Sequence, residues 1–146
     1  MAARTTKELV DMMARDCIAV RVRRLNRVIS SFYDAALRPL GVKVSQMNIL
    51  LVTAKLGLAH PNRVCELLQL DSSTLSRNVE RMRARRWLEV VRSQDARAQP
   101  FRLTATGERL LQKAAPLWEQ AQQEAAALLG KEGVEWLSNL THRLVT

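Results

Sequence analysis

The sequence predicts a mainly α-helical (α+β) fold, with long amphipathic helices at both ends flanking short elements and one small β-hairpin. Three observations indicate this class: apolar residues recur every three or four positions, glycine and proline fall mostly where that periodicity stops, and one short segment has strand-like composition. The 146 residues correspond to a single domain, and 47% of them are apolar. Such a chain can bury a hydrophobic core without help from disulfides or metal.

The first long helix is expected to end near Pro39. Its apolar stripe follows spacings of four and three and comprises Ile18, Val22, Leu25, Ile29, Phe32 and Ala36. Arg38 precedes a proline, which disfavours the helical conformation, and Gly41 suits the position just past a helix end. This pattern predicts one continuous helix from Lys7 onward, followed by a sharp break.

Three shorter helices are expected next. Ser45 can cap the first of them, Pro61 suits the first position of the second, and Asp71 is the N-cap candidate of the third. The third helix has one apolar side, formed by Leu75, Val79 and Met82. Its opposite side carries short polar and arginine side chains, at Ser73, Thr74, Arg77 and Arg81.

A hairpin and a second long helix complete the predicted fold. The segment 87–91 has strand-like composition, and residues 101–103 can pair with it across a charged tip. The long helix is expected to start near Thr104, to bend at Pro116 and to end at Gly130, before a terminal helix. The apolar stripes of such long helices need a partner, and a second subunit is one natural partner.

The formal charge of +9 at pH 7 suggests a polyanionic partner, either nucleic acid or an anionic membrane surface. Residues 1–43 contribute +5 and residues 63–102 contribute +4, whereas the segment from Leu103 onward carries four basic and five acidic side chains. The C-terminal segment is therefore not expected to bind the anion.

Several classes of protein are not expected. No apolar run approaches the roughly 20 residues of a membrane span, and the N-terminus does not lead into a secretory signal, so a cytoplasmic location is expected. Cys17 and Cys65 are far apart and lack metal-ligand spacing, which argues against a disulfide framework and a zinc site. Neither paired catalytic groups nor a phosphate loop is recognisable, so we expect neither an enzyme nor a cofactor.

Two short helices joined by a tight turn match the requirements of a helix-turn-helix DNA reader, because the second helix carries outward Ser, Thr and Arg side chains. An α-helix fits the major groove, where Arg can bind guanine O6 and N7 and a hydroxyl can bond base edges or phosphates. The hairpin then forms a wing whose arginines can reach phosphates or the minor groove. The wing candidates are Arg92, Arg97 and Arg102.

Four motifs follow one another in the order and spacing of one known family: LDSSTLSRNV at 70–79, Trp87-Leu88, Asp95-Ala96-Arg97 and LTATG at 103–107. Over nearly its whole length the sequence resembles the MarR family of bacterial transcriptional regulators. The resemblance implies a winged helix-turn-helix core over residues 44–103 and dimerisation helices over residues 1–43 and 104–146. It also implies a homodimer on a pseudo-palindromic operator in double-stranded DNA, and repression that a small aromatic ligand or oxidation relieves.

The resemblance also assigns roles to individual residues. The recognition-helix contacts would be Ser73, Thr74, Ser76, Arg77 and Arg81. Asp95 resembles the acid that braces the wing, and Arg97 resembles the arginine at its tip. Family wings often continue with further basic residues, whereas this one continues as Ala98-Gln99-Pro100, so its hold on DNA would rest on fewer charges.

The residues leave two alternatives open. Some MarR relatives sense peroxide through a thiol near the start of the first long helix, where Cys17 lies close to Arg15 and Arg21 in sequence. Arginine lowers a thiol pKa, but the neighbouring Asp16 opposes thiolate formation, and a free cysteine is also a common small apolar residue. The second alternative is a basic peripheral membrane protein, which the stretch 15–37 partly fits.

Two further roles follow, one from the apolar pattern of the helix that begins at Pro61 and one from the family pattern. Cys65 is expected to pack in the core. The family commonly binds aromatic carboxylates between the dimer helices and the winged domain, and Arg15 or Arg24 can meet such an anion.

Overall fold

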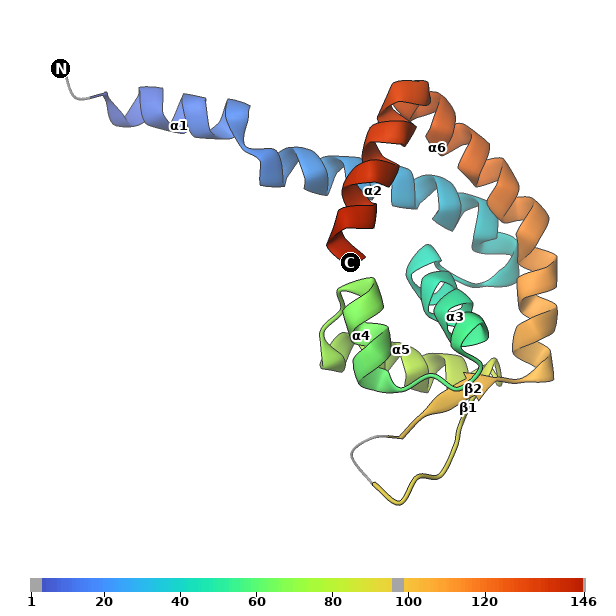
Figure 1. Ribbon diagram of the computed structural model, residues 1–146. Helices are drawn as coiled ribbons and strands as arrows, with labels where there is room; N and C mark the ends of the chain where they lie inside the picture. Colours follow the sequence, from blue (N-terminus) through green and yellow to red (C-terminus); the bar gives the residue numbers. More distant parts are fainter. Residues whose placement is uncertain (1–3, 96–98, 146) are drawn as a thin grey trace.

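The computed structural model describes residues 4–95 and 99–145 and is mainly helical with one two-stranded antiparallel sheet, which confirms the predicted fold class (Figure 1). The elements in chain order are α1 (Thr6–Asp16), α2 (Ile18–Leu37), the 3-10 turn η1 (Arg38–Leu40), α3 (Val44–Leu56), α4 (Pro61–Leu68), α5 (Ser72–Ala84), β1 (Leu88–Val90), β2 (Phe101–Leu103) and α6 (Ala105–Val145). Helix α2 packs along α6, while α3, α4, α5 and the strands form a compact unit beside this pair.

Helix α3 lies at the centre of the fold. Apolar residues occur on nearly all of its sides, and it contacts α2, α4, α6 and β2. The largest fully buried side chains come from α3 and the elements around it, and include Leu37, Met47, Ile49, Leu50, Val64, Met82, Leu88 and Phe101. Each apolar side chain buried in this way contributes about 1.5–3 kcal/mol of hydrophobic stabilisation.

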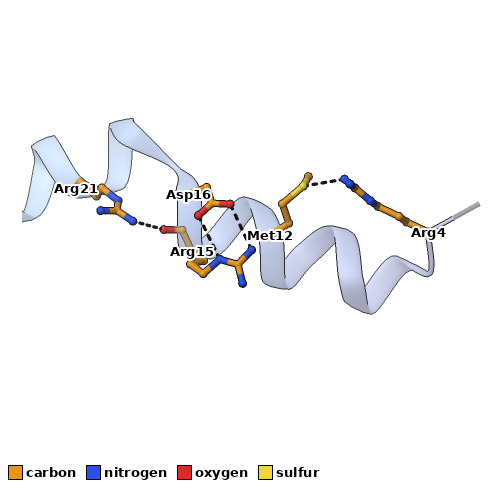
Figure 2. Close-up of polar contacts among 5 residues, drawn as sticks. All are labelled: Arg4, Met12, Arg15, Asp16 and Arg21. Carbon is orange, nitrogen blue, oxygen red and sulfur yellow. Dashed lines mark hydrogen bonds and ion pairs between the residues drawn. The ribbon is translucent and has the colours of Figure 1, made fainter.

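The prediction of one continuous N-terminal helix is wrong, because the chain leaves the helical conformation at Cys17, where φ is −65° and ψ is 109°. Figure 2 shows the polar contacts at this break. The Arg21 guanidinium donates a hydrogen bond to the backbone carbonyl oxygen of Arg15 at 2.8 Å, and the Arg15 side chain forms an ion pair with Asp16. Helix α1 extends away from the rest of the chain (Figure 1) and buries none of its residues.

Helix α3 starts one residue before the predicted cap. The N–H of Val44 donates to Asp34 of α2 at 2.8 Å, and the N–H of Lys43 donates to the side chain of Gln46 at 3.1 Å. Ser45 therefore lies inside the helix rather than at its cap. The capping carboxylate comes from ten residues earlier in the chain, and a local sequence pattern does not reveal it.

Helix α6 continues through Pro116 and leaves the helical conformation at Gly130, whose φ of 68° and ψ of 167° divide it into two arms. The residue that interrupts the helix is thus the predicted glycine. In Figure 1 the second arm turns back toward the rest of the chain. Before the break, α6 packs on α2, where Tyr33 donates a hydrogen bond to Gln122 and lies 6.5 Å from Trp118 between ring centroids.

The LTATG segment joins the hairpin to α6. Thr104 caps α6, since its hydroxyl oxygen accepts the N–H of Gly107 at 3.0 Å while the hydroxyl donates to the carbonyl of Arg86 at 2.5 Å. Gly107 is buried, and a Cβ at that position would lie 2.2 Å from the carbonyl oxygen of Trp87. The glycine therefore permits a close approach of two backbone segments.

We expect Gly107→Ala to destabilise the fold by about 1–3 kcal/mol, because backbone must move to admit the added methyl group. Urea unfolding followed by far-UV circular dichroism measures this loss. Gly133→Ala is the matched control in the same helix, because its nearest contact is the Leu129 side chain at 3.2 Å and alanine is the better helix former. Equal stability of the two variants would contradict the role of the close approach.

Candidate nucleic-acid interface

The turn between α4 and α5 is tight because Gln69 adopts a left-handed conformation, with φ of 52°. This conformation costs a residue with a side chain about 1–2 kcal/mol. Two hydrogen bonds hold it: the Gln69 side chain donates to the carbonyl of Glu66 at 2.8 Å, and the N–H of Leu70 donates to the carbonyl of Cys65 at 3.0 Å. The turn fixes the angle at which α5 leaves α4.

Asp71 caps α5, as the sequence predicts. One carboxylate oxygen accepts the backbone N–H of Thr74 at 2.7 Å and the hydroxyl of Ser73 at 2.6 Å, and the other accepts the hydroxyl of Thr74 at 2.7 Å. These hydrogen bonds favour the charged form and hold the pKa of Asp71 well below its usual range. The carboxylate is therefore ionised at neutral pH.

The predicted inward and outward sides of α5 are both confirmed. Leu75, Val79 and Met82 are buried, which anchors the helix against the core. The five predicted contact residues all lie on the other side, where Ser73, Ser76, Arg77 and Arg81 are exposed and Thr74 is partly buried. A guanidinium nitrogen of Arg77 lies 3.5 Å from the Thr74 hydroxyl oxygen, so the Arg77 side chain lies back along the helix toward Thr74.

Sequence reasoning missed Glu80, which also lies on the exposed side of α5. Its carboxylate pairs with Arg83 at 3.4 Å, and its side chain is 67% exposed. The signal was its spacing, since Glu80 follows Arg77 by three residues and Ser73 by seven, which places all three on one face. A carboxylate there can accept from the cytosine amino group and repels phosphate.

The hairpin pairs as predicted, with Leu88 opposite Leu103 and Val90 opposite Phe101. Arg102 bonds Glu89 on the neighbouring strand at 2.5 Å, so this wing candidate already has a carboxylate partner. Arg92 is exposed just beyond β1.

The sequence also assigns wing roles to Asp95 and Arg97. Asp95 is exposed and its N–H donates to the Ser93 hydroxyl at 3.3 Å, whereas Arg97 lies outside the described residues. The bracing role of Asp95 stays a prediction.

A cavity of about 450 Å³ lies between α4, α5 and the hairpin. Its lining from α5 includes Ser73, Ser76 and Glu80, and Gln99 contributes from the hairpin. Cys65 of α4 also borders it and is partly buried against the core, where burial raises the pKa of its thiol. The expectation that Cys65 packs with the core is confirmed, although the residue is not fully enclosed.

The remaining predicted residues lie on the N-terminal helices, away from α5. Cys17 is partly buried at the break between α1 and α2, and Arg24 is exposed on α2. Arg15 and Arg21 are engaged with Asp16 and with a backbone carbonyl, respectively (Figure 2).

A second cavity, of about 190 Å³, has an almost entirely apolar lining and lies between α3 and α6. The lining residues are Met47, Leu51, Leu111, Ala114, Ala115 and Trp118. Within the described residues, no cluster of His, Cys, Asp and Glu has the geometry to hold a metal ion. The same part of the chain holds no helix that is long and apolar enough to cross a membrane.

The fold is a winged helix-turn-helix, in which α4 and α5 form the helix pair, β1 and β2 form the wing, and long helices flank this core. This class of protein regulates transcription. A family model described as the MarR family matches residues 40–99. Solved structures give the same class. The M. tuberculosis transcriptional regulator MOSR, in complex with DNA, is 33% identical, with 88% of this chain and 96% of that chain covered and a TM-score of 0.75.

Two other structures match at lower identity. A mutant of MarR from E. coli complexed with operator DNA is 20% identical, with 92% and 98% of the two chains covered and a TM-score of 0.79. BpsR from Bordetella bronchiseptica, whose DNA binding is regulated by 6-hydroxynicotinic acid, is 21% identical, with 89% and 95% covered and a TM-score of 0.75. No curated protein matches the sequence. The chain belongs to the MarR family of transcriptional regulators, as its motifs imply.

Proposed function

We propose that the protein is a homodimeric repressor that binds a pseudo-palindromic operator in double-stranded DNA and is released by a small aromatic ligand. One observation carries the proposal: the outward side of α5 presents hydroxyl and guanidinium groups from a helix-turn-helix scaffold. The relatives crystallised with DNA support the partner, and the regulation of BpsR by an aromatic acid supports the kind of effector.

In this proposal residues 44–103 form the DNA-binding core, and α5 enters the major groove. Arg77 binds a guanine edge there, while Arg81 lies one turn further along the same side and contacts the groove wall. Arg92 and Arg97 of the hairpin contact phosphates or the adjacent minor groove, and Asp95 braces the hairpin. Because two symmetric recognition helices enter successive major grooves, footprints should show half-sites about 34–36 Å apart.

We expect Arg77→Ala to weaken operator binding by about 5-fold to 150-fold and to relax selectivity at the contacted base, because one bidentate arginine–guanine pair contributes about 1–3 kcal/mol. Arg97→Ala should instead weaken binding to all sequences alike and reduce its salt dependence. Fluorescence anisotropy with operator and shuffled duplexes at several salt concentrations measures both effects.

Arg109→Ala is the matched control for Arg77→Ala, since Arg109 is an exposed arginine on α6 that donates to the Thr106 hydroxyl of its own helix. Unchanged operator affinity in Arg77→Ala at fixed salt would rule out α5 as the reader. Tighter binding to anionic vesicles than to duplex DNA would favour a membrane surface as the partner.

The surface of the terminal helices supports dimerisation through residues 1–43 and 104–146. Helix α1 has eleven residues and buries none of them, and a helix of that length is marginal in water by itself. Exposed apolar side chains gather on α1, early α2 and late α6, namely Leu9, Val10, Met13, Ile18, Val22, Leu128, Trp136, Leu140 and Leu144. A second copy that covers them gains about 25 cal/mol for each Å² of apolar surface removed from water.

We expect the double variant Met13→Glu and Trp136→Glu to lower dimer affinity at least about tenfold, because each change places a charge where the dimer buries an apolar side chain that is 66% or 62% exposed in the single chain. Analytical ultracentrifugation measures the dimer, and circular dichroism checks the fold. Gln123→Glu adds the same charge at an exposed polar position of α6 and should leave the dimer intact. A double variant that dimerises as tightly as the wild type would exclude this interface.

The apolar cavity between α3 and α6 is the proposed effector site. Its volume of about 190 Å³ exceeds the roughly 150 Å³ of a cavity known to take up benzene, so one aromatic ring fits. Trp118 and Leu51 border it from the two helices, so an occupant changes how the terminal helix α6 sits on the DNA-binding core. That displacement would change the distance between the two recognition helices of the dimer, so that they no longer match the spacing of the two half-sites.

We expect Ala115→Phe, which fills this cavity, to abolish release of operator DNA by benzoate or 6-hydroxynicotinate while DNA binding persists. Gln120→Phe on the exposed side of α6 is the control and should leave release unchanged. Equal release from both variants would show that the ligand binds elsewhere. Release by peroxide that Cys17→Ser abolishes would replace the ligand mechanism with thiol oxidation.

A further inference from the structure

Two hydroxyl groups at the exposed start of α5 donate to the same carboxylate. The oxygens of Ser73 and Thr74 lie 2.6 and 2.7 Å from the two carboxylate oxygens of Asp71. Both hydroxyls belong to the set of residues predicted to contact DNA, so the direction of their hydrogen bonds bears on what they can recognise.

The direction follows from where the protons are. A hydroxyl has one proton to donate and lone pairs that accept, whereas an ionised carboxylate only accepts. Both hydroxyl protons must therefore point at Asp71. The Ser73 oxygen is left with acceptor sites alone, and this side chain is exposed.

We propose that Asp71 sets the hydrogen-bond polarity of the recognition helix, so that Ser73 accepts from an exocyclic amino group of adenine or cytosine in the major groove. The inference rests on the proposed insertion of α5 into that groove. Phosphate oxygens and the guanine major-groove edge offer only acceptors, and thymine offers an acceptor and a methyl group. Asp71 is a positioning residue here, because it acts through Ser73.

Thr74 extends the same logic to Arg77. The Thr74 hydroxyl donates to Asp71, and its oxygen lies 3.5 Å from a guanidinium nitrogen of Arg77. Arg77, whose side chain can only donate, therefore lies on the same face of α5 as Ser73, whose oxygen can only accept. Ser73 and Arg77 are four residues apart, and side chains at that spacing are neighbours on a helix. The half-site should thus pair a guanine, read by Arg77, with an adenine or cytosine close by.

Ser76 provides the internal contrast. It is exposed on the same helix, but its side chain makes no hydrogen bond within the residues that the structure describes, so its hydroxyl can donate as well as accept. Ser76→Ala is therefore the matched control for a serine that Asp71 does not orient.

The test measures binding of the full-length protein to operator duplexes in which each half-site base is replaced in turn, at fixed salt. Asp71→Gly and Asp71→Ala both remove the carboxylate that accepts the Ser73 proton, and glycine is a well-tolerated N-cap residue, so Asp71→Gly does this with little loss of helix stability. We expect each to reduce the preference for adenine or cytosine over guanine or thymine at one position by about threefold to tenfold, the range of a single hydrogen bond.

Ser73→Ala should lose the same preference at the same position, and combining it with Asp71→Gly should add nothing further, because both changes remove one interaction. Thermal midpoints measured alongside separate this loss from a weakened helix, which would lower affinity for all duplexes equally. Ser76→Ala should leave the preference at that position intact.

The outcomes are distinguishable. Unchanged base preferences in both Asp71 variants, with Ser73→Ala still altering one position, overturn the inference and leave the DNA-binding role of α5 standing. A Ser73→Ala variant that loses affinity for all sequences alike points to a phosphate contact and overturns it as well. If Arg77→Ala and Ser73→Ala both bind as the wild type does, the proposed function fails instead.

Discussion

The central position of α3 is the constraint on which the rest of the structure depends. This helix has apolar residues on nearly every side, so it must be covered from several directions, and α2, α4, α6 and β2 provide that cover. Its own buried hydroxyl, at Thr53, is satisfied by the carbonyl of Ile49 at 2.7 Å. One helix thus connects the terminal helices to α4 and the hairpin, through packing and through the hydrogen bond from Val44 of α3 to Asp34 of α2.

That connection gives the terminal helices a way to influence α5. Helix α6 touches α3 and β2, β1 contacts α5, and Thr104 links the start of α6 to the residues that follow α5. A closely packed protein interior has low compressibility, so a displacement of one helix also shifts the elements packed against it. A ligand in the proposed site between α3 and α6 would therefore act on elements that also hold α5, although this site lies away from the exposed face proposed to contact DNA.

Much of this arrangement could be predicted from sequence because its signals are local. The cap at Asp71, the buried side at Leu75, Val79 and Met82, and the break at Gly130 each follow from residue type and spacing. The features that escaped prediction depend on contacts between distant residues or on side chains without a local signature. Asp34 caps a helix ten residues later, Arg102 is held by Glu89 across the hairpin, and neither glycine nor proline marks the break at Cys17.

Charge alone is a poor guide to the recognition surface. Of the arginines near α5, Arg83 pairs with Glu80 and Arg85 lies 4.5 Å from the ring centre of Trp87, so they are partly committed within the chain. The start of α5 carries instead a carboxylate and the hydroxyls that it orients, which weakens attraction to phosphate at that end. The carboxylate of Asp71 caps α5, but its charge does not favour binding of a polyanion. The position of this carboxylate agrees with the proposed role of α5, in which Ser73 and Arg77 contact base edges and other basic residues contact phosphates, since phosphate contacts carry no sequence information.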